Sequence, residues 1–242
     1  MNIVITAGGT TEHIDPVRAI TNTGTGTLSS IIADYLIGFT KNIDRIFYIH
    51  TPKAKKPKMI DDRLTFIEVE DTNSVAAAVE KVLTENKIDT FIHAMAISDY
   101  YVDFVTTVNG LVNDICTDDN SSLAANILSG NSKLDNSKKL SSNEDNLVVM
   151  LKKTPKIIGM IKELSPETKL IGFKLLNNVS EEELINVAYN LLLKNKCDYV
   201  VANDATKISE QRHDALFVDA NKNVAFHATT NEEIARFMST II

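Results

Sequence analysis

Runs of consecutive apolar residues, many of them β-branched, alternate along the chain with segments in which apolar residues have helical spacing. The runs lie at residues 2–6, 44–50, 89–97, 169–173, 198–203 and 215–219. Because they are apolar at consecutive rather than alternate positions, they are typical of strands that are buried on both faces, as in a parallel sheet.

The segments between these runs predict amphipathic helices. The clearest repeats apolar residues at i, i+3, i+4, i+7 and i+8 from Leu28 to Leu36, and Gly38 is a plausible stop. Similar spacing predicts four further helices. One lies near residues 75–83, after capping candidates at 72–74, and one near 157–164, after the helix opener Pro155. The other two lie near 184–192 and 234–241, after capping boxes at Ser180/Glu183 and Thr230/Glu233. Strand–helix alternation of this kind predicts an α/β fold, a Rossmann-like three-layer sandwich with a mostly parallel central sheet and helices on both faces.

One long stretch, 103–145, interrupts this alternation. It is dominated by Asn, Asp, Ser, Thr and Lys and has few periodic apolar positions. A disordered surface insertion and an active-site flap are both compatible with that composition, and its position directly after a strand end favours the flap. We expect one domain over 1–242, with a flap or insertion at about 103–145 that makes no core of its own.

Composition narrows the class of protein. The chain has 242 residues, 44% of them hydrophobic, with a net charge of −7 and a pI near 5.3. This is too apolar for intrinsic disorder and too acidic for nucleic acid to be the main partner. No apolar run approaches the length of a membrane span, and the N-terminus lacks a signal-peptide pattern, so we expect a cytoplasmic protein. Two distant cysteines make a disulfide framework or a structural zinc site improbable.

Two glycine-containing segments are candidates for phosphate binding. Gly8 and Gly9, followed by Thr10, come directly after the first strand, and residues 22–27, with Gly24, Thr25 and Gly26, precede a helix N-terminus. Exposed N–H groups at such a position suit an anion, although a strand-to-helix turn and a flexible loop with a threonine cap explain the same residues. Neither G-x-G-x-x-G nor the P-loop motif is present, so ordinary NAD and Walker-type sites are disfavoured.

Other polar residues near strand ends have weaker signals. Asp99 is placed at the end of the most apolar run, where a carboxylate is costly unless it binds a partner or caps the following turn. The lysines of 52–58 suit a solvated loop, or one that attracts an anionic substrate. No metal-ligand spacing is found among the histidines, so we expect no metal bound by the protein alone.

Several motifs, in order and over nearly the whole chain, resemble the phosphopantothenate–cysteine ligase family, and most closely its stand-alone bacterial form. They are Ile5-Thr6-Ala7-Gly8-Gly9-Thr10-Thr11-Glu12, Ile14-Asp15-Pro16-Val17-Arg18, Ile20-Thr21-Asn22, Ala96-Ile97-Ser98-Asp99-Tyr100, Lys139-Leu140-Ser141-Ser142, Leu151-Lys152-Lys153-Thr154-Pro155, Gly172-Phe173-Lys174 and Asp198-Tyr199-Val200-Val201-Ala202-Asn203-Asp204.

The resemblance implies a step of coenzyme A biosynthesis. The carboxylate of 4′-phosphopantothenate would attack the α-phosphate of CTP, giving an acyl-cytidylate and pyrophosphate, and the amine of cysteine would then displace CMP to form an amide. Mg²⁺ is implied with the nucleotide, no flavin is implied, and the partners are these small molecules and a second copy of the chain, with no nucleic acid and no membrane.

The resemblance also assigns residues. Asn22 matches the catalytic asparagine, whose amide can hydrogen-bond the acyl-cytidylate but cannot act as a base. The nucleotide contacts would be His93, Ala94, Met95, Asp99, Lys139, Lys153, Thr154, Pro155, Phe173 and Lys194, and the phosphate or substrate loops would supply Gly8, Gly9, Thr10, Gly24, Thr25 and Gly26. Lys139 matches a flap lysine that, in the homodimer, would close over the partner's site.

The chain departs from the family pattern in the second glycine segment. Where the family usually reads Asn-His-Ser-Ser-Gly-Lys-Met-Gly, residues 22–29 read Asn-Thr-Gly-Thr-Gly-Thr-Leu-Ser, so the lysine is missing. A regulatory nucleotide-binding module without activity is therefore an alternative, as is a short-chain NAD(P)-dependent oxidoreductase. The latter would need Tyr-x-x-x-Lys, whereas Tyr189 and Lys194 are one residue too far apart. The choice between CTP and ATP is open.

Overall fold

The computed structural model describes residues 1–116, 123–144, 146–209 and 211–242. The chain groups into two compact units. Unit 1 comprises residues 1–10, 23–96 and 156–242, and unit 2 comprises residues 11–22 and 97–155. Both chain ends therefore belong to unit 1. That the chain forms a single domain stays a prediction. The structure shows only that its contacts divide into these two units.

Unit 1 is built around a sheet whose eight described strands run in the order β12-β11-β10-β9-β6-β1-β4-β5. The strands are β1 (Asn2–Ala7), β4 (Arg45–His50), β5 (Leu64–Glu68), β6 (Thr90–His93), β9 (Lys169–Leu176), β10 (Tyr199–Ile208), β11 (His213–Asp219) and β12 (Val224–Ala228). Neighbouring strands from β5 to β10 pair in parallel, which confirms the mostly parallel α/β sheet.

The strand predictions need three corrections. β10–β11 and β11–β12 are antiparallel, so residues 215–219 do not form a parallel strand. β5 and β12 were not predicted, because both strands contain exposed positions and lack a continuous run of buried apolar residues. The run 89–97 is a strand only from Thr90 to His93, after which the chain leaves the sheet.

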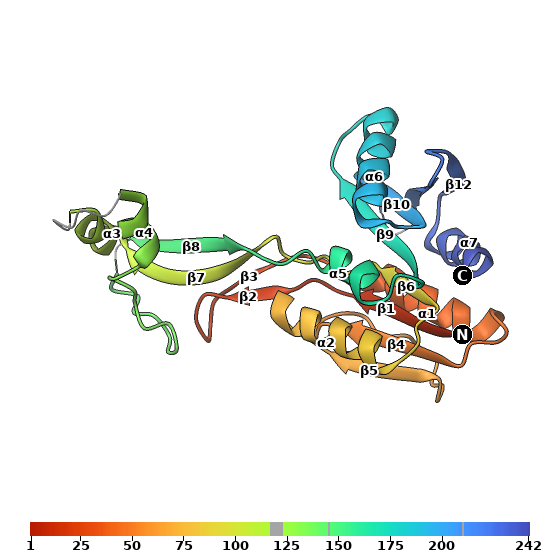
Figure 1. Cartoon of the computed structure of the whole chain (residues 1–242), viewed down its shortest axis with the longest axis horizontal. Helices are drawn as coiled ribbons and strands as arrows, with labels where there is room; N and C mark the ends of the chain where they lie inside the picture. Colours follow the sequence, from red (N-terminus) through yellow and green to blue (C-terminus); the bar gives the residue numbers. More distant parts are fainter. Residues whose placement is uncertain (117–122, 145, 210) are drawn as a thin grey trace. The chain divides into compact units, whose positions relative to one another are not determined.

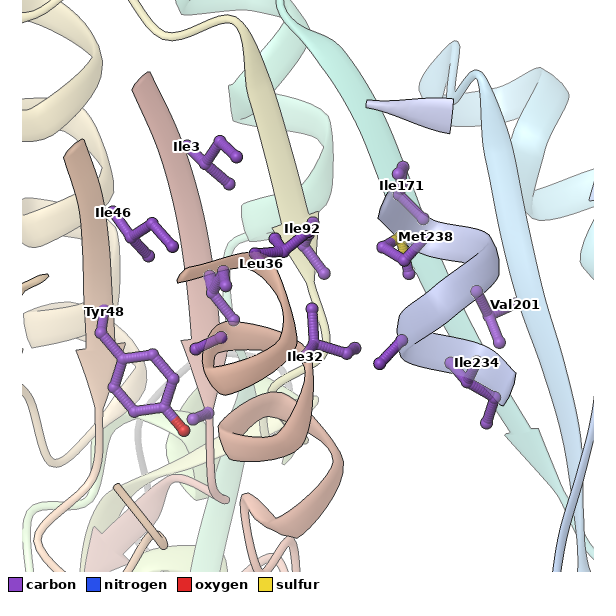
Figure 2. Close-up of a cluster of buried hydrophobic side chains, with 14 of the residues drawn as sticks. Ile3, Ile32, Leu36, Ile46, Tyr48, Ile92, Ile171, Val201, Ile234 and Met238 are labelled. Atoms are coloured by element: carbon purple, nitrogen blue, oxygen red, sulfur yellow. The ribbon is translucent and has the colours of Figure 1, made fainter. Parts of the chain in front are cut away.

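Helices cover both faces of this sheet. They are α1 (Thr27–Phe39), α2 (Thr72–Glu85), α5 (Ile157–Leu164), α6 (Glu181–Asn195) and α7 (Asn231–Ile241). The buried faces of α1 and α7 lie beside each other on one side and share a core with β1, β4, β6, β9 and β10 (Figure 1; Figure 2). Figure 2 shows Ile32 and Leu36 of α1 and Ile234 and Met238 of α7 within this cluster. The other helical layer consists of α2, α5 and α6, in which α5 packs against both α2 and α6.

Two of the predicted helix starts are confirmed and two differ by a residue or more. Ser180 and Thr230 are N-caps whose hydroxyls accept from the N–H groups of Glu183 and Glu233, as predicted. The α2 prediction was shifted, since Asp71 is the N-cap and forms a reciprocal capping box with Ser74. Lys156 rather than Pro155 precedes the first residue of α5.

Unit 2 has a different construction: its described residues form two antiparallel strand pairs and two short helices. β2 (Thr11–His13) pairs with β3 (Ala19–Thr21), and β7 (Tyr100–Thr107) pairs with β8 (Leu147–Lys153). α3 (Val108–Ile115) follows β7 directly, and α4 (Leu123–Ser129) packs against α3 (Figure 1).

The polar stretch contains a few buried apolar side chains, and the expectation that it has no core of its own stays a prediction. Phe104, Val105 and Leu140 are all at most 5% exposed. The side chains of Asp114 and Ser132 bond to each other, and Thr106 donates to the carbonyl of Ser132. The apolar positions are too few for a periodic signal, because buried polar side chains satisfied by local partners replace them. Residues 117–122 and 145 of this stretch lie outside the described residues.

Among the described residues, no helix is long and apolar enough to cross a membrane.

Candidate functional site

The parallel strands of unit 1 all direct their carboxyl ends to one edge of the sheet, where ligands bind in open α/β folds. At the end of β1 the chain turns through Gly8, whose φ of 97° is the left-handed region that favours glycine. A Cβ on Gly8 would lie 2.2 Å from the hydroxyl oxygen of Thr51. Gly9 and Thr10 then continue beside Ala96, to whose carbonyl the Thr10 N–H donates at 3.0 Å. The turn is therefore specific for glycine at its first position.

The second glycine segment packs directly on the first. A Cβ on Gly24 would come within 2.4 Å of the carbonyl oxygen of Gly8, so the two backbones touch. Gly26, with a φ of 71°, lies against Ala54 in the loop after β4. The N–H of Lys55 donates to the carbonyl of Thr25 at 3.0 Å. Three loops thus meet at this edge, and the structure brings together all of the predicted glycine residues.

The N-terminus of α1 opens from this cluster. Gly26 is its N-cap and provides no side-chain hydrogen bond to the first turn. The nearest substitute is the hydroxyl of Thr25, 3.3 Å from the N–H of Thr27. A helix start with glycine at the cap and hydroxyls beside it suits a phosphate group, since the first-turn N–H groups point outward with the positive end of the helix dipole.

His93 is positioned for packing rather than for proton transfer. Its Nδ1 lies 3.2 Å from the hydroxyl of Thr6, which also accepts a 3.0 Å hydrogen bond from the N–H of Met95. Burial lowers the pKa of His93 to about 4, so the imidazole is neutral at pH 7. Thr6 therefore fixes the start of the 93–95 segment as it leaves the sheet.

The two remaining predicted residues of unit 1 lie at different places. Phe173, on β9 beside the strand that ends at His93, is half-buried against the core shared with α1 and α7. Lys194 is exposed in the last turn of α6. Because α6 leads from the carboxyl end of β9 back to the start of the parallel strand β10, Lys194 lies at the opposite edge of the sheet from the glycine loops. The structure does not bring it near them.

In unit 2, Asp99 and the 153–155 segment are adjacent. The N–H of Thr154 donates to the carbonyl of Asp99 at 3.1 Å, and its hydroxyl donates to the carbonyl of Ser98 at 2.7 Å. Thr154 is buried, while Lys153, Pro155 and Asp99 are exposed. Asp99 was predicted to be a costly carboxylate at a strand end, which is wrong: the strand ends six residues earlier, at His93, and the Asp99 side chain is exposed.

Asn22 directly follows β3, at the open end of the β2–β3 hairpin, and is half-buried. The hydroxyls of Thr11 and Thr21 bond across the last pair of that hairpin. Asn22, Pro155 and the residues after Met95 all lie within a few residues of positions where the chain passes between the units, after residues 10, 22, 96 and 155.

The other end of the hairpin holds the segment that carries Lys139. Asp15, in the turn of the hairpin, accepts from the N–H groups of Val17 (2.8 Å), Arg18 (2.7 Å) and Leu140 (3.1 Å). Arg18 lies 3.1 Å from the same carboxylate and donates to the carbonyl of Leu140 at 2.7 Å. Burial raises the pKa of Asp15, but these backbone donors and Arg18 outweigh it, so the net shift is downward. Lys139 is exposed beside this buried contact.

The sequence analysis did not identify the residues whose contacts hold the predicted site residues in position. Asp15 and Arg18 were noted only as part of a motif, and Thr6 and Ala54 were not singled out. A buried aspartate before proline, with arginine three positions later, is a signal for a hydrogen-bonded turn. The contact of Ala54 with Gly26 has no sequence signal, because it joins loops that follow different strands.

A hollow of about 360 Å³ lies beyond β4 and β5, but none of the predicted residues lines it; its walls are Pro52, Glu68, Val69, Glu70, Asp71 and Ser74. Within the described ranges there is no group of three or more His, Cys, Asp or Glu side chains that could hold a metal ion.

Comparison with known proteins gives a consistent result. Residues 1–108 and 124–242 match the family described as the DNA/pantothenate metabolism flavoprotein C-terminal domain. The chain is 29% identical over 233 residues to the coenzyme A biosynthesis bifunctional protein CoaBC of Thermococcus kodakarensis, covering 96% of this chain and 48% of that protein. The chain thus spans about half the length, or less, of the curated relatives it matches.

Solved structures show the same fold. The DNA/pantothenate metabolism flavoprotein from Streptococcus pneumoniae superposes with a TM-score of 0.83 at 36% identity, covering 98% of this chain and 96% of that chain. A Cab2 mutant in complex with phosphopantothenate-cysteine superposes with a TM-score of 0.67 at 16% identity, covering 99% and 86% of the two chains, a likeness of fold.

Proposed function

Because the chain belongs to the family of the DNA/pantothenate metabolism flavoprotein C-terminal domain, we propose that it is a phosphopantothenate–cysteine ligase of coenzyme A biosynthesis. It joins 4′-phosphopantothenate to cysteine through an acyl-nucleotidylate, with CTP as the nucleotide. The observation that carries this proposal is the family match over nearly the whole chain. A biosynthetic enzyme with these substrates is expected in the cytoplasm.

The reaction has two steps, which share their main demands on the protein. In the first, a substrate carboxylate attacks the α-phosphorus of CTP and pyrophosphate leaves. In the second, the cysteine amine attacks the acyl carbon, CMP leaves with the anhydride oxygen, and the amide forms. Both steps need donors for developing negative charge, and the anhydride must be kept from water.

We assign phosphate binding to the loops of unit 1. Gly8, Gly24 and Gly26 allow these loops to pack closely on one another, which a Cβ at any of the three would obstruct. Their backbone N–H groups are proposed to donate to the phosphates. The N-terminus of α1 adds its dipole. This arrangement supports anion binding without the lysine that the usual pattern of the family has after Gly26. Mg²⁺ would arrive bound to the triphosphate, which supplies the oxygen ligands that this ion prefers.

We assign two charged or polar functions to unit 2. The amide of Asn22 is proposed to hydrogen-bond the acyl-nucleotidylate, and Lys139 is proposed to neutralise the nucleotide phosphates. Asp99, Lys153, Thr154 and Pro155, joined by the Thr154 hydrogen bonds, are proposed as nucleotide contacts. His93, Ala94 and Met95, fixed by Thr6, are proposed to contact the nucleotide through their backbone, beside Phe173. Lys194 lies at the other edge of the sheet and is left out of this proposed nucleotide site.

We further propose that the chain works as a homodimer in which Lys139 serves the partner's site. The support is the hairpin of unit 2, where three residue pairs separate Asn22 from the turn that holds Leu140. Three pairs span roughly 10 Å, so a lysine at that turn is held away from the asparagine of its own chain.

The direct test is pyrophosphate release that requires CTP, 4′-phosphopantothenate and cysteine together, with the amide product identified by mass spectrometry. Replacing CTP by ATP tests the nucleotide assignment separately. An inactive regulatory module would bind nucleotide without releasing pyrophosphate, and an oxidoreductase would oxidise NADPH. Either result, in place of product formation, would overturn the proposal.

A further inference from the structure

The turn at residues 14–18 and the segment at 136–140 are more than a hundred residues apart in sequence but are joined by three hydrogen bonds, beside an ion pair within the turn. The N–H of Leu140 donates to Asp15, and the carbonyl of Leu140 accepts from Arg18. The side-chain amide of Asn136 donates to the carbonyl of Ile14 at 3.1 Å. The Arg18–Asp15 ion pair closes the set.

Asp15 is the centre of these contacts. Its side chain is completely buried. One carboxylate oxygen accepts from two backbone N–H groups, those of Val17 and Arg18, which shapes the turn. The other accepts from the Leu140 N–H, which attaches the distant segment, and forms an ion pair with the Arg18 side chain. A buried carboxylate with every bond satisfied in this way holds its partners rigidly, because losing one donor leaves buried charge unpaired.

Lys139 is the residue whose position these bonds determine. Leu140 is bonded at both its N–H and its carbonyl, so its backbone is fixed on the turn, and the Lys139 Cα is one peptide away. The Lys139 side chain is exposed, which leaves its ammonium group available next to a residue whose backbone is hydrogen-bonded on both sides. A lysine held in this way loses less conformational freedom when it binds an anion.

We propose that Asp15 is a positioning residue for Lys139, holding the lysine where it meets the phosphates of the nucleotide. The inference rests on the proposed function for the identity of that nucleotide. The attachment of 136–140 to the turn stands on the contacts alone.

The test is a double-mutant cycle with Asp15→Asn and Lys139→Ala. Asparagine has the shape of aspartate, but whichever way its amide is turned, one pair of N–H donors faces an NH₂ group. We expect Asp15→Asn to lower kcat/KM for CTP by about tenfold to a hundredfold, the range for a misplaced binding group. In the Lys139→Ala background the same change should lower kcat/KM by less than about twofold, because the lysine it positions is already gone. Losses that multiply would show that Asp15 acts independently of Lys139 and would overturn the proposal.

A matched control lies in the same segment. Asp135 is exposed, and its carboxylate accepts from the N–H and hydroxyl of Ser137. Asp135→Asn makes the same chemical change without touching the 14–18 turn, and we expect wild-type kcat/KM. Should Asp15→Asn fail to fold, Asn136→Ala removes one contact between the turn and the segment and should give a smaller loss that also disappears without Lys139.

A second readout does not depend on ligase activity. Amide hydrogen exchange at Leu140 in the unliganded protein should be faster in Asp15→Asn than in wild type, and unchanged in Asp135→Asn. Equal exchange in all three proteins would overturn the attachment, whatever the activity shows. If the wild-type protein forms no product but exchange is faster in Asp15→Asn, the proposed function fails while the attachment holds. In that case CTP binding is compared directly: weaker binding by Asp15→Asn than by wild type would support a role of Asp15 in nucleotide binding, and equal binding would exclude it.

Discussion

The two units of this protein fix their candidate functional residues by different physical means. In unit 1 the residues follow buried parallel strands, and backbone contacts between loops set the geometry, as where the carbonyl of Gly8 touches Gly24. In unit 2 they lie on short antiparallel pairs with little apolar burial, and hydrogen bonds from polar side chains set it, as at Asp15 and Thr154.

This difference predicts how each unit responds to change. A loop packed backbone to backbone tolerates no added atom, so unit 1 is sensitive to small increases in volume. A segment held by a carboxylate tolerates volume but not loss of a charge or a donor. Function in unit 1 should therefore fail through destabilisation, and function in unit 2 should fail while the protein stays folded.

The largest effect on this comparison is expected at Asn22. Asn22→Asp replaces a donor by a negative charge next to a phosphoanhydride, and loss of one such donor costs about 2.7–4 kcal/mol of transition-state stabilisation. We expect product formation to fall at least a hundredfold, measured as pyrophosphate release, while the thermal unfolding midpoint stays within a degree or two of wild type. Near-normal turnover would remove Asn22 from the catalytic residues, and a large drop in the midpoint would contradict the distinction between the units.

The second prediction sharpens the part assigned to unit 2 by asking which chain Lys139 serves. Mixing Asn22→Asp with Lys139→Ala chains should restore activity, because a hybrid dimer has one site with both native groups. At equal amounts and free exchange, half the dimers are hybrids, so about a quarter of wild-type activity is expected. Subunit exchange must be shown independently, for example by native mass spectrometry of differently tagged chains. Confirmed exchange without recovered turnover would mean that Lys139 serves its own chain's site or none.

For unit 1 the corresponding change adds one methyl group. Gly8→Ala places a Cβ 2.2 Å from the Thr51 hydroxyl at a φ of 97°, so both sterics and backbone conformation oppose it. We expect the free energy of unfolding to fall by about 1–3 kcal/mol in urea denaturation. Gly159→Ala in α5 is the matched control, because its Cβ would have its nearest contact at 3.7 Å, from the side-chain oxygen of Asn195. Equal stability of the two variants would contradict the close packing of these loops.

The smallest effect at neutral pH is expected at the buried imidazole of unit 1, whose contribution to stability changes only in acid. Burial lowers the pKa of His93 from 6.5 to about 4 in the folded protein, so between these values the unfolded state binds more protons. The buried neutral imidazole therefore costs the folded protein no stability above pH 6.5. As the pH falls toward 4, the free energy of unfolding decreases by up to about 3 kcal/mol, because the unfolded state takes up the proton first. In His93→Gln the free energy of unfolding should vary less over that window. His227→Gln, at an exposed position, should keep the wild-type dependence; identical curves for all three proteins would show that the shift is absent.

The sheet and its helices could be predicted because the signals are local. Continuous apolar runs identified β1, β4 and the start of β9, and serine and threonine caps identified the starts of α6 and α7. The errors occur where burial is uneven. β5 and β12 have exposed positions that break the pattern, and the direction of β11 depends on a turn that periodicity does not encode.

The candidate site was accessible only in part. Placing residues after strand ends located the glycine segments correctly, since parallel strands share one carboxyl edge. The same reasoning failed for Asp99, because the apolar run continued after the strand had ended. It also gave no warning that Lys194 lies at the other edge, which follows from the direction of α6 between two parallel strands.

The sequence by itself determined the α/β class, the order of the helices and of most strands in unit 1, and the motifs that carry the family likeness. Each of these is written in residues close together along the chain. Only the tertiary structure decided that Gly24 lies against Gly8, that Ala54 closes the space beside Gly26, and that Asp15 holds Leu140. These contacts join segments up to 125 residues apart. Their geometry depends on how strands and turns pack, and no local preference of the residues encodes that packing.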